Sequence, residues 1–296
     1  MKRVLVTGAT GNIGREVIHF LNELNQECEI IAAARDVESA KKEFLGYPSL
    51  SFEWFDFENR NSFASAFESI DTLFLLRPPH ISEVEKYFQP LLLAAKESGI
   101  EEIVFLSVQG VEKSSIIPHN KIEALIRSYG FKYIFVRPGY FMQNLTTTLL
   151  AEIRKNHTIT LPSGHAKFNW IDIGNIGEAT AMLINSFPEY QNAGYDITGT
   201  ENKDFYQVTY LMSKVIGTEI CFNSINPLSF YFKKRNEGVQ KGFALVMTML
   251  HFLPRFQEEP EISENFEKLT GKSPTRLVDF IEREKIKMTP AQLDVS

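Results

Sequence analysis

Residues Arg3–Val17 read RVLVTGATGNIGREV, in which an apolar run leads into three glycines and then a helical pattern. Gly8, Gly11 and Gly14 thus follow a predicted strand and open a predicted helix. In that context the first glycine permits a tight turn, the second lets backbone approach a pyrophosphate, and the third lets helix and strand pack closely. The helix N-terminus then attracts phosphate charge. The stretch predicts a dinucleotide-binding loop, with a ligand-free turn as the alternative.

The rest of the first half repeats this strand–helix alternation. Strands that are apolar throughout are typical of a parallel sheet covered on both faces. Short connections between strands and helices indicate α/β architecture. We therefore predict a Rossmann-type doubly wound parallel sheet. Its strands are expected at Arg3–Thr7, Glu29–Ala34, Leu50–Phe55, Thr72–Leu76, Glu102–Ser107 and Lys132–Arg137, and its helices at Ile13–Asn25, Val37–Phe44, Ser62–Glu68, Ile81–Ser98 and Asn120–Ser128.

After Pro138 the pattern becomes less regular and mostly helical, with a long helix predicted over Met142–Lys155 and a turn-rich segment after it. No linker rich in Gly, Ser or Pro separates the two halves. We predict a Rossmann domain at residues 1–140. A smaller, mostly helical C-terminal lobe at residues 141–296 is expected to pack against it and to be partly interleaved with it.

Composition narrows the function classes. The formal charge of −6 and a pI near 5.6 disfavour nucleic acid as a partner, because phosphate binding needs a basic face. The two cysteines, Cys28 and Cys221, suit a reducing compartment. The apolar stretch Gly242–Leu253 is shorter than the roughly 20 residues of a membrane span, and we interpret it as a buried helix or a lid. We expect a cytoplasmic protein with no membrane partner and, because its histidines are scattered, no metal site.

Several strings resemble a known family. Residues 4–14, VLVTGATGNIG, resemble the extended or atypical short-chain dehydrogenase/reductases, and the whole chain resembles their NmrA-like group. That group includes NAD(P)H-dependent quinone reductases, triphenylmethane-dye reductases and NADP(H)-sensing regulators. The other matching strings are AAARD (32–36), WFDFEN (54–59), LLRPP (75–79), FLSVQG (105–110), HNKIEALIRSYGFKYIFVRPGYFMQN (119–144) and LTGKSPTRLVDFI (269–281).

The end of the second predicted strand bears on cofactor choice. Arg35 stands about twenty residues after the glycine loop, where an acid would bind the ribose of NAD and an arginine the 2′-phosphate of NADP. Its planar, permanent charge suits phosphate. We interpret the adjacent Asp36 as the N-cap of the helix starting at Val37, with ribose recognition as the alternative. NADP(H) is therefore predicted over NAD(H).

Further cofactor contacts are expected at the carboxyl ends of the strands, where open α/β sheets place ligands. The resemblance implies that Asp56 and Phe57 border the adenine; a helix-leading turn is the alternative. Arg77 is expected to reach a phosphate or to face solvent, and Lys121 to touch the nicotinamide ribose or to be solvated. The full predicted set is Gly8, Thr10, Gly11, Asn12, Ile13, Gly14, Arg35, Asp56, Phe57, Leu76, Arg77, Ser107, Lys121 and Pro138.

The helix after Ser107 lacks the Tyr-x-x-x-Lys pair that most short-chain dehydrogenases use. A match at Tyr210–Lys214 lies far along the chain, in a helix that reads as a packing face. His119 stands at the expected place instead, and the resemblance implies a histidine there in the quinone-reductase branch. A histidine can donate a proton near neutral pH. His119 and Ser107 are the catalytic candidates, with helix capping as the alternative for His119.

An acceptor pocket is expected beyond the sixth strand. Aromatic side chains there would stack on a flat substrate, although plain core packing is the alternative. The residues predicted for this pocket are Tyr140, Phe141, Asn144 and Trp170.

Two functions stay open from sequence. The first is hydride transfer from NADPH to a flat, electron-poor acceptor such as a quinone, dye or enone. The second is a non-catalytic NADP(H) redox sensor that acts on a protein partner. A sugar-nucleotide epimerase or dehydratase is disfavoured because that chemistry relies on the missing tyrosine.

Overall fold

The computed structural model describes residues 2–24, 28–113, 115 and 117–289, which divide into two compact units. The first unit contains the described residues up to Pro138, together with Ile173–Ile197 and Glu264–Lys272. The second contains Gly139–Asp172, Thr198–Ser263 and the described residues from Ser273 onward. Neither unit is therefore a single continuous stretch of sequence.

The first unit is built on a seven-stranded parallel sheet in the order β10-β6-β5-β4-β1-β2-β3. From β1 the chain winds outward through β2 and β3 on one side and through β4, β5, β6 and β10 on the other. The predicted fold class is confirmed. The strands are β1 (Lys2–Val6), β2 (Cys28–Ala34), β3 (Ser51–Trp54), β4 (Thr72–Leu76), β5 (Glu102–Leu106), β6 (Lys132–Pro138) and β10 (Ala193–Ile197).

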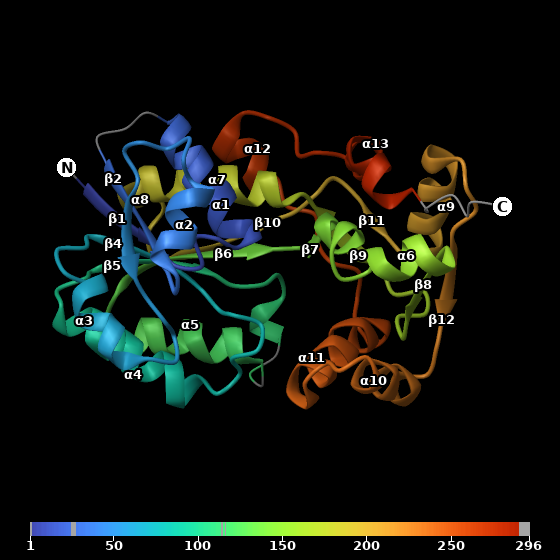
Figure 1. Ribbon diagram of the computed structural model, residues 1–296, viewed down its shortest axis with the longest axis horizontal. Coiled ribbons are helices and arrows are strands. Elements are labelled where there is room, and N and C mark those ends of the chain that lie inside the picture. Colours follow the sequence, from blue (N-terminus) through green and yellow to red (C-terminus); the bar gives the residue numbers. More distant parts are fainter. Residues whose placement is uncertain (1, 25–27, 114, 116, 290–296) are drawn as a thin grey trace. The chain divides into compact units, whose positions relative to one another are not determined.

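Helices cover both faces of this sheet (Figure 1). One face packs against α3, α4 and α5 through an apolar core that includes Leu5, Phe88 and Phe105. On the other face α1 packs along α7. The helices of this unit are α1 (Asn12–Glu23), α2 (Val37–Glu43), α3 (Phe63–Ala66), α4 (Val84–Glu97), α5 (Pro118–Ser128), α7 (Ile173–Asn185), α8 (Phe187–Tyr190) and α12 (Asn265–Thr270). Asn25, the predicted end of the first helix, lies outside the described residues.

The second unit has two small sheets. β7 (Tyr140–Phe141), β9 (Phe168–Ile171) and β11 (Asn202–Lys203) form one, and β8 (Thr158–Leu161) pairs with β12 (Cys221–Ser224) in the other. A second apolar core, which includes Trp170, Phe205 and Phe280, lies within this unit. Its helices are α6 (Leu150–Asn156), α9 (Phe205–Ile216), α10 (Pro227–Asn236), α11 (Lys241–Phe252) and α13 (Leu277–Met288), with 3-10 turns η3 (Met142–Thr146) and η4 (Leu253–Phe256).

One sequence prediction for the second unit was wrong, and a second was incomplete. The helix predicted over Met142–Lys155 is interrupted, because η3 ends at Thr146 and Thr147 has the non-helical backbone angles φ −129° and ψ −91°. The threonines at 146–148 are β-branched, and such residues lower helix propensity. The turn-rich segment that follows begins at the end of β8 and runs into β9; these two strands have four residues each, which is too short to give a clear alternating pattern.

The predicted apolar helix at Gly242–Leu253 is present as α11, but only one of its faces is buried. Ala244, Met247 and His251 point inward, whereas Leu245 and Leu250 are exposed. Within the described part of the chain, no helix is long and apolar enough to cross a bilayer.

Candidate functional site

The glycine loop turns back tightly between β1 and α1. Gly8 has a φ of +61°, and its carbonyl oxygen accepts a hydrogen bond from the Gly11 amide at 2.9 Å. A Cβ atom at Gly14 would lie 2.2 Å from that same oxygen and 2.8 Å from the Ala9 Cα. Both neighbours are backbone atoms that cannot move aside. The loop therefore requires glycine at position 14.

The N-terminus of α1 is open to a ligand. Gly11 is its N-cap, no side chain caps the helix, and no acidic residue stands in the first turn. Thr10, Gly11 and Asn12 are exposed. Amides at an uncapped helix N-terminus bind anions, because they lack intrahelical acceptors and lie at the positive end of the helix dipole. This end of α1 therefore fits a phosphate or pyrophosphate group.

Thr7 fixes the loop at the point where the strand order reverses, and sequence reasoning did not single it out. Its buried hydroxyl donates to the carbonyl oxygen of Phe74 at 2.9 Å and accepts from the amide of Leu76 at 3.1 Å. The Leu76 side chain in turn lies against Gly8, where a Cβ would approach it to 2.7 Å. Ligands of open α/β sheets bind at this switch point, outside the carboxyl ends of the strands.

At the end of β2, Arg35 and Asp36 have separate roles. A carboxylate oxygen of Asp36 accepts a hydrogen bond from the Ser39 amide at 3.0 Å, so Asp36 is the N-cap of α2 as predicted. Arg35 is exposed beside it. With the aspartate engaged in its own helix, Arg35 is the side chain at this strand end that can meet an anion.

The corner after β3 is a self-contained turn. The Asp56 carboxylate accepts a hydrogen bond from the Glu58 amide at 3.0 Å, and the Asp56 amide donates to the Ser62 hydroxyl at 3.0 Å. Phe57 is buried against Phe88. These contacts form the helix-leading turn that was the alternative to an adenine site. An adenine contact for Asp56 and Phe57 stays a prediction.

Arg77, after β4, faces the protein. It donates to the carbonyl oxygens of Pro78, Pro79 and Ile81 at 3.1, 3.2 and 2.6 Å. Its Nε donates to Nε2 of His119 at 3.4 Å, which places the imidazole proton of a neutral ring on Nδ1. Arg77 thus organises the loop after β4, and a phosphate contact would require it to leave these carbonyls.

The environment of His119 changes what this side chain can do. Burial, reinforced by the Arg77 charge, lowers the pKa of His119 to about 3, so the ring is neutral near pH 7. A neutral imidazole does not transfer a proton as an imidazolium would. It can instead donate a hydrogen bond from Nδ1 to an oxygen that gains negative charge. Lys121, two residues on, is exposed.

Ser107, the other catalytic candidate, belongs to a buried charge cluster that the sequence did not reveal. Its hydroxyl donates to Glu123 in α5 at 2.7 Å, and Ser107 is 2% exposed. Glu123, 1% exposed, also accepts from Arg137 at 2.7 and 3.0 Å and from Arg127 at 2.8 Å. A catalytic role for Ser107 stays a prediction, and it would require the hydroxyl hydrogen to leave Glu123. Glu123 lies on the apolar face of the predicted helix Asn120–Ser128, and this position could have indicated a buried acid.

In the second unit, Tyr140 lies in an aromatic cluster, and its partner His251 was also missed by sequence reasoning. His251 Nδ1 lies 2.7 Å from the Met247 carbonyl oxygen, so Nδ1 carries the proton. Tyr140 therefore donates its hydroxyl to His251 Nε2, at 2.9 Å. Burial lowers the pKa of His251 to about 4 and raises the pKa of Tyr140, which keeps both groups neutral.

The remaining predicted pocket residues differ in exposure. Trp170 is fully buried, packs edge-on against Tyr140 and donates its ring N–H to the Lys203 carbonyl oxygen at 3.0 Å. Trp170 thus packs beneath Tyr140 in the core, which is the alternative to a substrate contact for this residue. Phe141 and Asn144 are half-buried, and Asn144 is hydrogen-bonded to Tyr140.

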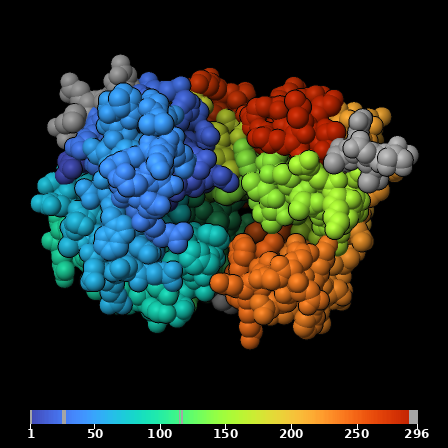
Figure 2. All heavy atoms as spheres, viewed as in Figure 1, coloured from blue at the N-terminus to red at the C-terminus, as the bar shows by residue number. Residues whose placement is uncertain are grey.

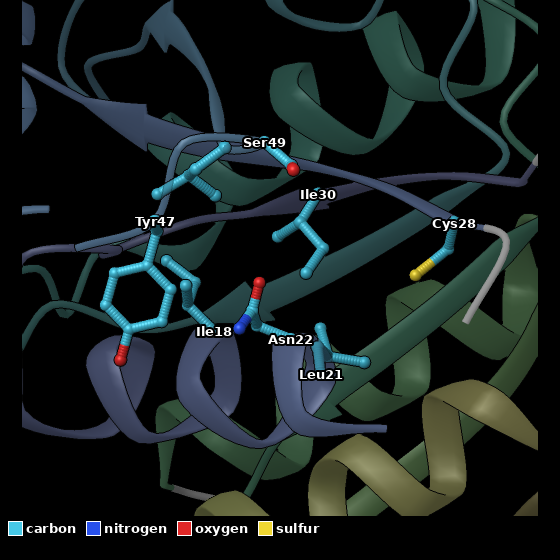
Figure 3. Close-up of a pocket in the computed structure, with 8 residues that line it drawn as sticks. Ile18, Leu21, Asn22, Cys28, Ile30, Tyr47 and Ser49 are labelled. Atoms are coloured by element: carbon cyan, nitrogen blue, oxygen red, sulfur yellow. The ribbon is translucent and has the colours of Figure 1, made fainter. Parts of the chain in front are cut away.

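A separate hollow of about 100 Å³ lies at the amino ends of β2 and β3, away from the glycine loop (Figure 3). It is lined by the later turns of α1, the start of β2 and the loop before β3, including Asn22, Cys28 and Tyr47. Burial raises the pKa of the Cys28 thiol, which disfavours a reactive thiolate. The hollow is at the amino end of β2 and is therefore not the place where this fold holds a nucleotide.

A family model described as the NmrA-like family matches residues 1–281. The chain is 27% identical over 278 residues to the Prestalk A differentiation protein A of Dictyostelium discoideum, which covers 94% of this chain and 90% of that protein. It is 25% identical over 281 residues to the NAD(P)H azoreductase of Xenophilus azovorans, covering 94% and 96%.

The fold is also similar to that of a solved enzyme, the triphenylmethane reductase of Citrobacter sp. The TM-score is 0.83 at 21% identity, and the match covers 97% of this chain and 100% of the reductase. A structure of that reductase in complex with NADP(H) gives a TM-score of 0.80 at 22% identity, covering 96% and 99%. At this identity the likeness establishes the fold.

Proposed function

This chain belongs to the NmrA-like family, and from that premise we propose that it is an NADP(H)-binding oxidoreductase that reduces a flat, electron-poor acceptor by hydride transfer. The observation that carries the proposal is the loop Gly8–Gly14, with glycine required at position 14 and the N-terminus of α1 uncapped. A cradle of this kind suits the pyrophosphate of a dinucleotide.

The preference for NADP(H) rests on Arg35. It is exposed at the end of β2, while one carboxylate oxygen of Asp36 caps α2 by accepting a hydrogen bond from the Ser39 amide. Arginine is the side chain that accommodates the 2′-phosphate in this fold. The complex of the Citrobacter sp. reductase with NADP(H) supports the same choice.

When bound, the reduced nicotinamide would supply a hydride, and one proton from solvent would complete the two-electron reduction of a quinone, azo dye or enone. His119, neutral, is proposed to donate a hydrogen bond from Nδ1 to the acceptor oxygen as charge develops there. Glu123 holds Ser107 and Arg137 at the carboxyl ends of β5 and β6 and thereby positions α5, which carries His119. Tyr140, Phe141 and Asn144 are proposed to contact the acceptor.

The test is NADPH oxidation by the full chain, followed with and without oxygen across a panel of quinones, azo dyes and enones. We expect turnover with at least one class of acceptor. Tight NADPH binding without turnover of any acceptor would contradict the enzymatic proposal.

A second candidate function is a non-catalytic NADP(H) sensor. Two observations favour it. Helix α5 has no tyrosine at the expected position, and the lowered pKa of His119 keeps its ring neutral near pH 7, so His119 is not an imidazolium that could act as an acid. A protein partner retained by the chain with NADPH but not with NADP⁺ would support this function. Equal retention with and without either nucleotide would exclude it.

A further inference from the structure

Residues 227–256, which we call the α10–α11 segment, expose an unusual amount of apolar surface. Seven of the fourteen large hydrophobic residues that are exposed in the described chain belong to it. The most exposed is Phe256, at 73%. Figure 2 shows this segment in orange on the surface of the second unit. The seven residues are Leu228, Phe232, Leu245, Met249, Leu250, Leu253 and Phe256.

Helix α11 is apolar on both of its sides. Its inner side packs through Ala244, Met247 and His251. Its outer side carries Leu245 and Met249 one turn apart, and further apolar residues continue it into η4. A helix that is hydrophobic all round is normally enclosed by apolar surroundings. The outer side of α11 therefore lacks such surroundings in the isolated chain, and large exposed apolar patches mark interaction sites.

The charges around this surface favour an anionic partner. The segment holds five basic residues and one acidic residue, although the whole chain has a formal charge of −6. No Asp or Glu occurs between Glu237 and Glu258, and the acids that follow the segment are Glu258, Glu259 and Glu261, of which Glu259 is paired with Lys167. Lys233 and Lys234 are engaged in ion pairs. The exposed cations are Arg235, Lys241 and Arg255, of which Lys241 begins α11 and Arg255 lies in η4, at the two ends of the apolar stripe.

We propose that this surface binds the face of an anionic lipid bilayer, with α11 and η4 lying in the interface. Apolar side chains in the acyl boundary and flanking Lys or Arg at the headgroups are the two terms that hold an interfacial helix. This is surface contact rather than spanning, so it revises only the sequence expectation of no membrane partner.

Charge argues for the bilayer over a second copy of the chain. A two-fold interface brings the same patch together from both subunits, so the basic side chains of one copy would approach those of the other. Like charges at an interface are unfavourable. A bilayer that contains acidic lipids supplies both the apolar depth and the opposite charge.

Helix α11 also connects this surface to a residue that is predicted to contact the acceptor. His251, on the inner side of α11, accepts a hydrogen bond from the Tyr140 hydroxyl. The same helix therefore joins the lipid-binding surface to a predicted acceptor residue, which favours a lipid-soluble acceptor. This consequence rests on the proposed function, whereas vesicle binding requires no turnover and is tested separately.

The test is co-sedimentation of the full chain with vesicles of phosphatidylcholine alone or mixed with phosphatidylserine. We expect at least about tenfold stronger partitioning onto the anionic vesicles, weakening as salt is raised. The variant Leu245→Gln/Leu250→Gln should lower partitioning by about tenfold or more, because both side chains are exposed in solution and buried in the interface. Lys241→Gln/Arg255→Gln should remove most of the preference for anionic vesicles.

The matched control is Leu45→Gln/Ile286→Gln, which removes two exposed apolar side chains outside the segment, 82% and 90% exposed. It should leave partitioning unchanged. Equal losses in the control and the Leu245→Gln/Leu250→Gln variant, or no sedimentation with anionic vesicles, would overturn the proposal. So would a dimer by light scattering that the Leu245→Gln/Leu250→Gln variant dissociates and that does not bind vesicles.

Discussion

The glycine loop of the first unit and the Tyr140–His251 cluster of the second unit are built in different ways. The loop consists of seven consecutive residues whose backbone forms the site. The cluster joins side chains 111 positions apart, and its polar groups are neutral because they are buried. A site made by local backbone tolerates few substitutions at its glycines, whereas a site made by distant side chains depends on the packing of a whole unit.

The largest change in stability is expected from a substitution at Glu123. It tests whether the first unit also depends on buried side chains that come together from different parts of the sequence. Glu123→Ala leaves Arg137 without its buried partner. Breaking a buried ion pair costs about 3–5 kcal/mol, so the free energy of unfolding should fall by that amount. Urea denaturation measures it. Glu112→Gln, which alters only an exposed partner of Arg137, should change stability by less than about 0.5 kcal/mol.

A loss of cofactor affinity of at least about a hundredfold is expected from Gly14→Ala, because the added Cβ displaces the backbone that cradles the phosphates. Titration calorimetry with NADPH measures it. Gly46→Ala is the control, since a Cβ there has no neighbour within 4 Å. Similar affinities for the two variants would mean that the loop is not the binding element.

The second unit should lose stability in acid because of His251. Its pKa in the folded chain, about 4, is below the value of about 6.5 for an unperturbed histidine, so protonation favours the unfolded state. The stability from the neutral ring is present above pH 6.5 and is lost as pH falls toward 4. Between pH 7 and 5 we expect this residue to account for about 2 kcal/mol.

That pH effect can be assigned to the second unit by fluorescence. In a Trp54→Phe background the emission comes from Trp170, which packs against Tyr140. His251→Gln should reduce the difference in unfolding free energy between pH 7 and pH 5 by the same 2 kcal/mol or so, because the variant has no ring to titrate. An unchanged difference would show that His251 is not buried as a neutral group.

The smallest effect is expected at Arg35, at the rim of the nucleotide site. Arg35→Ala removes one exposed guanidinium that is proposed to meet the 2′-phosphate, and should weaken NADPH about tenfold while leaving NADH nearly unchanged. Competition between the two nucleotides measures the ratio of dissociation constants. Equal weakening of both would place the 2′-phosphate elsewhere.

The sequence predicted the first unit well because its information is local. Apolar strands, short connections and the glycine spacing each reside within a few residues, and the cap at Asp36 follows from its position before α2. It did not predict the contacts of Thr7, Glu123 or His251. Each of these polar side chains is buried and acquires its partner only when strands or helices distant in sequence come together.

The second unit was predicted less well for the same reason. Its strands β7 and β11 have two residues each, which is too few for a periodic pattern, and the threonines near 147 interrupt a helix that apolar spacing alone favoured. His119 shows a further limit. Its type and position indicated an acid, whereas burial beside Arg77 lowers the pKa of its ring, a contact that the sequence does not show; its catalytic role stays a prediction.

Calorimetry of the unaltered chain shows whether the amides after β1 hold the diphosphate of a nicotinamide nucleotide, as we propose. We expect saturable heats with both NADPH and NADP⁺, and weaker binding of NADH. No heat from any of these nucleotides at millimolar concentration, with no competition among them, would contradict it.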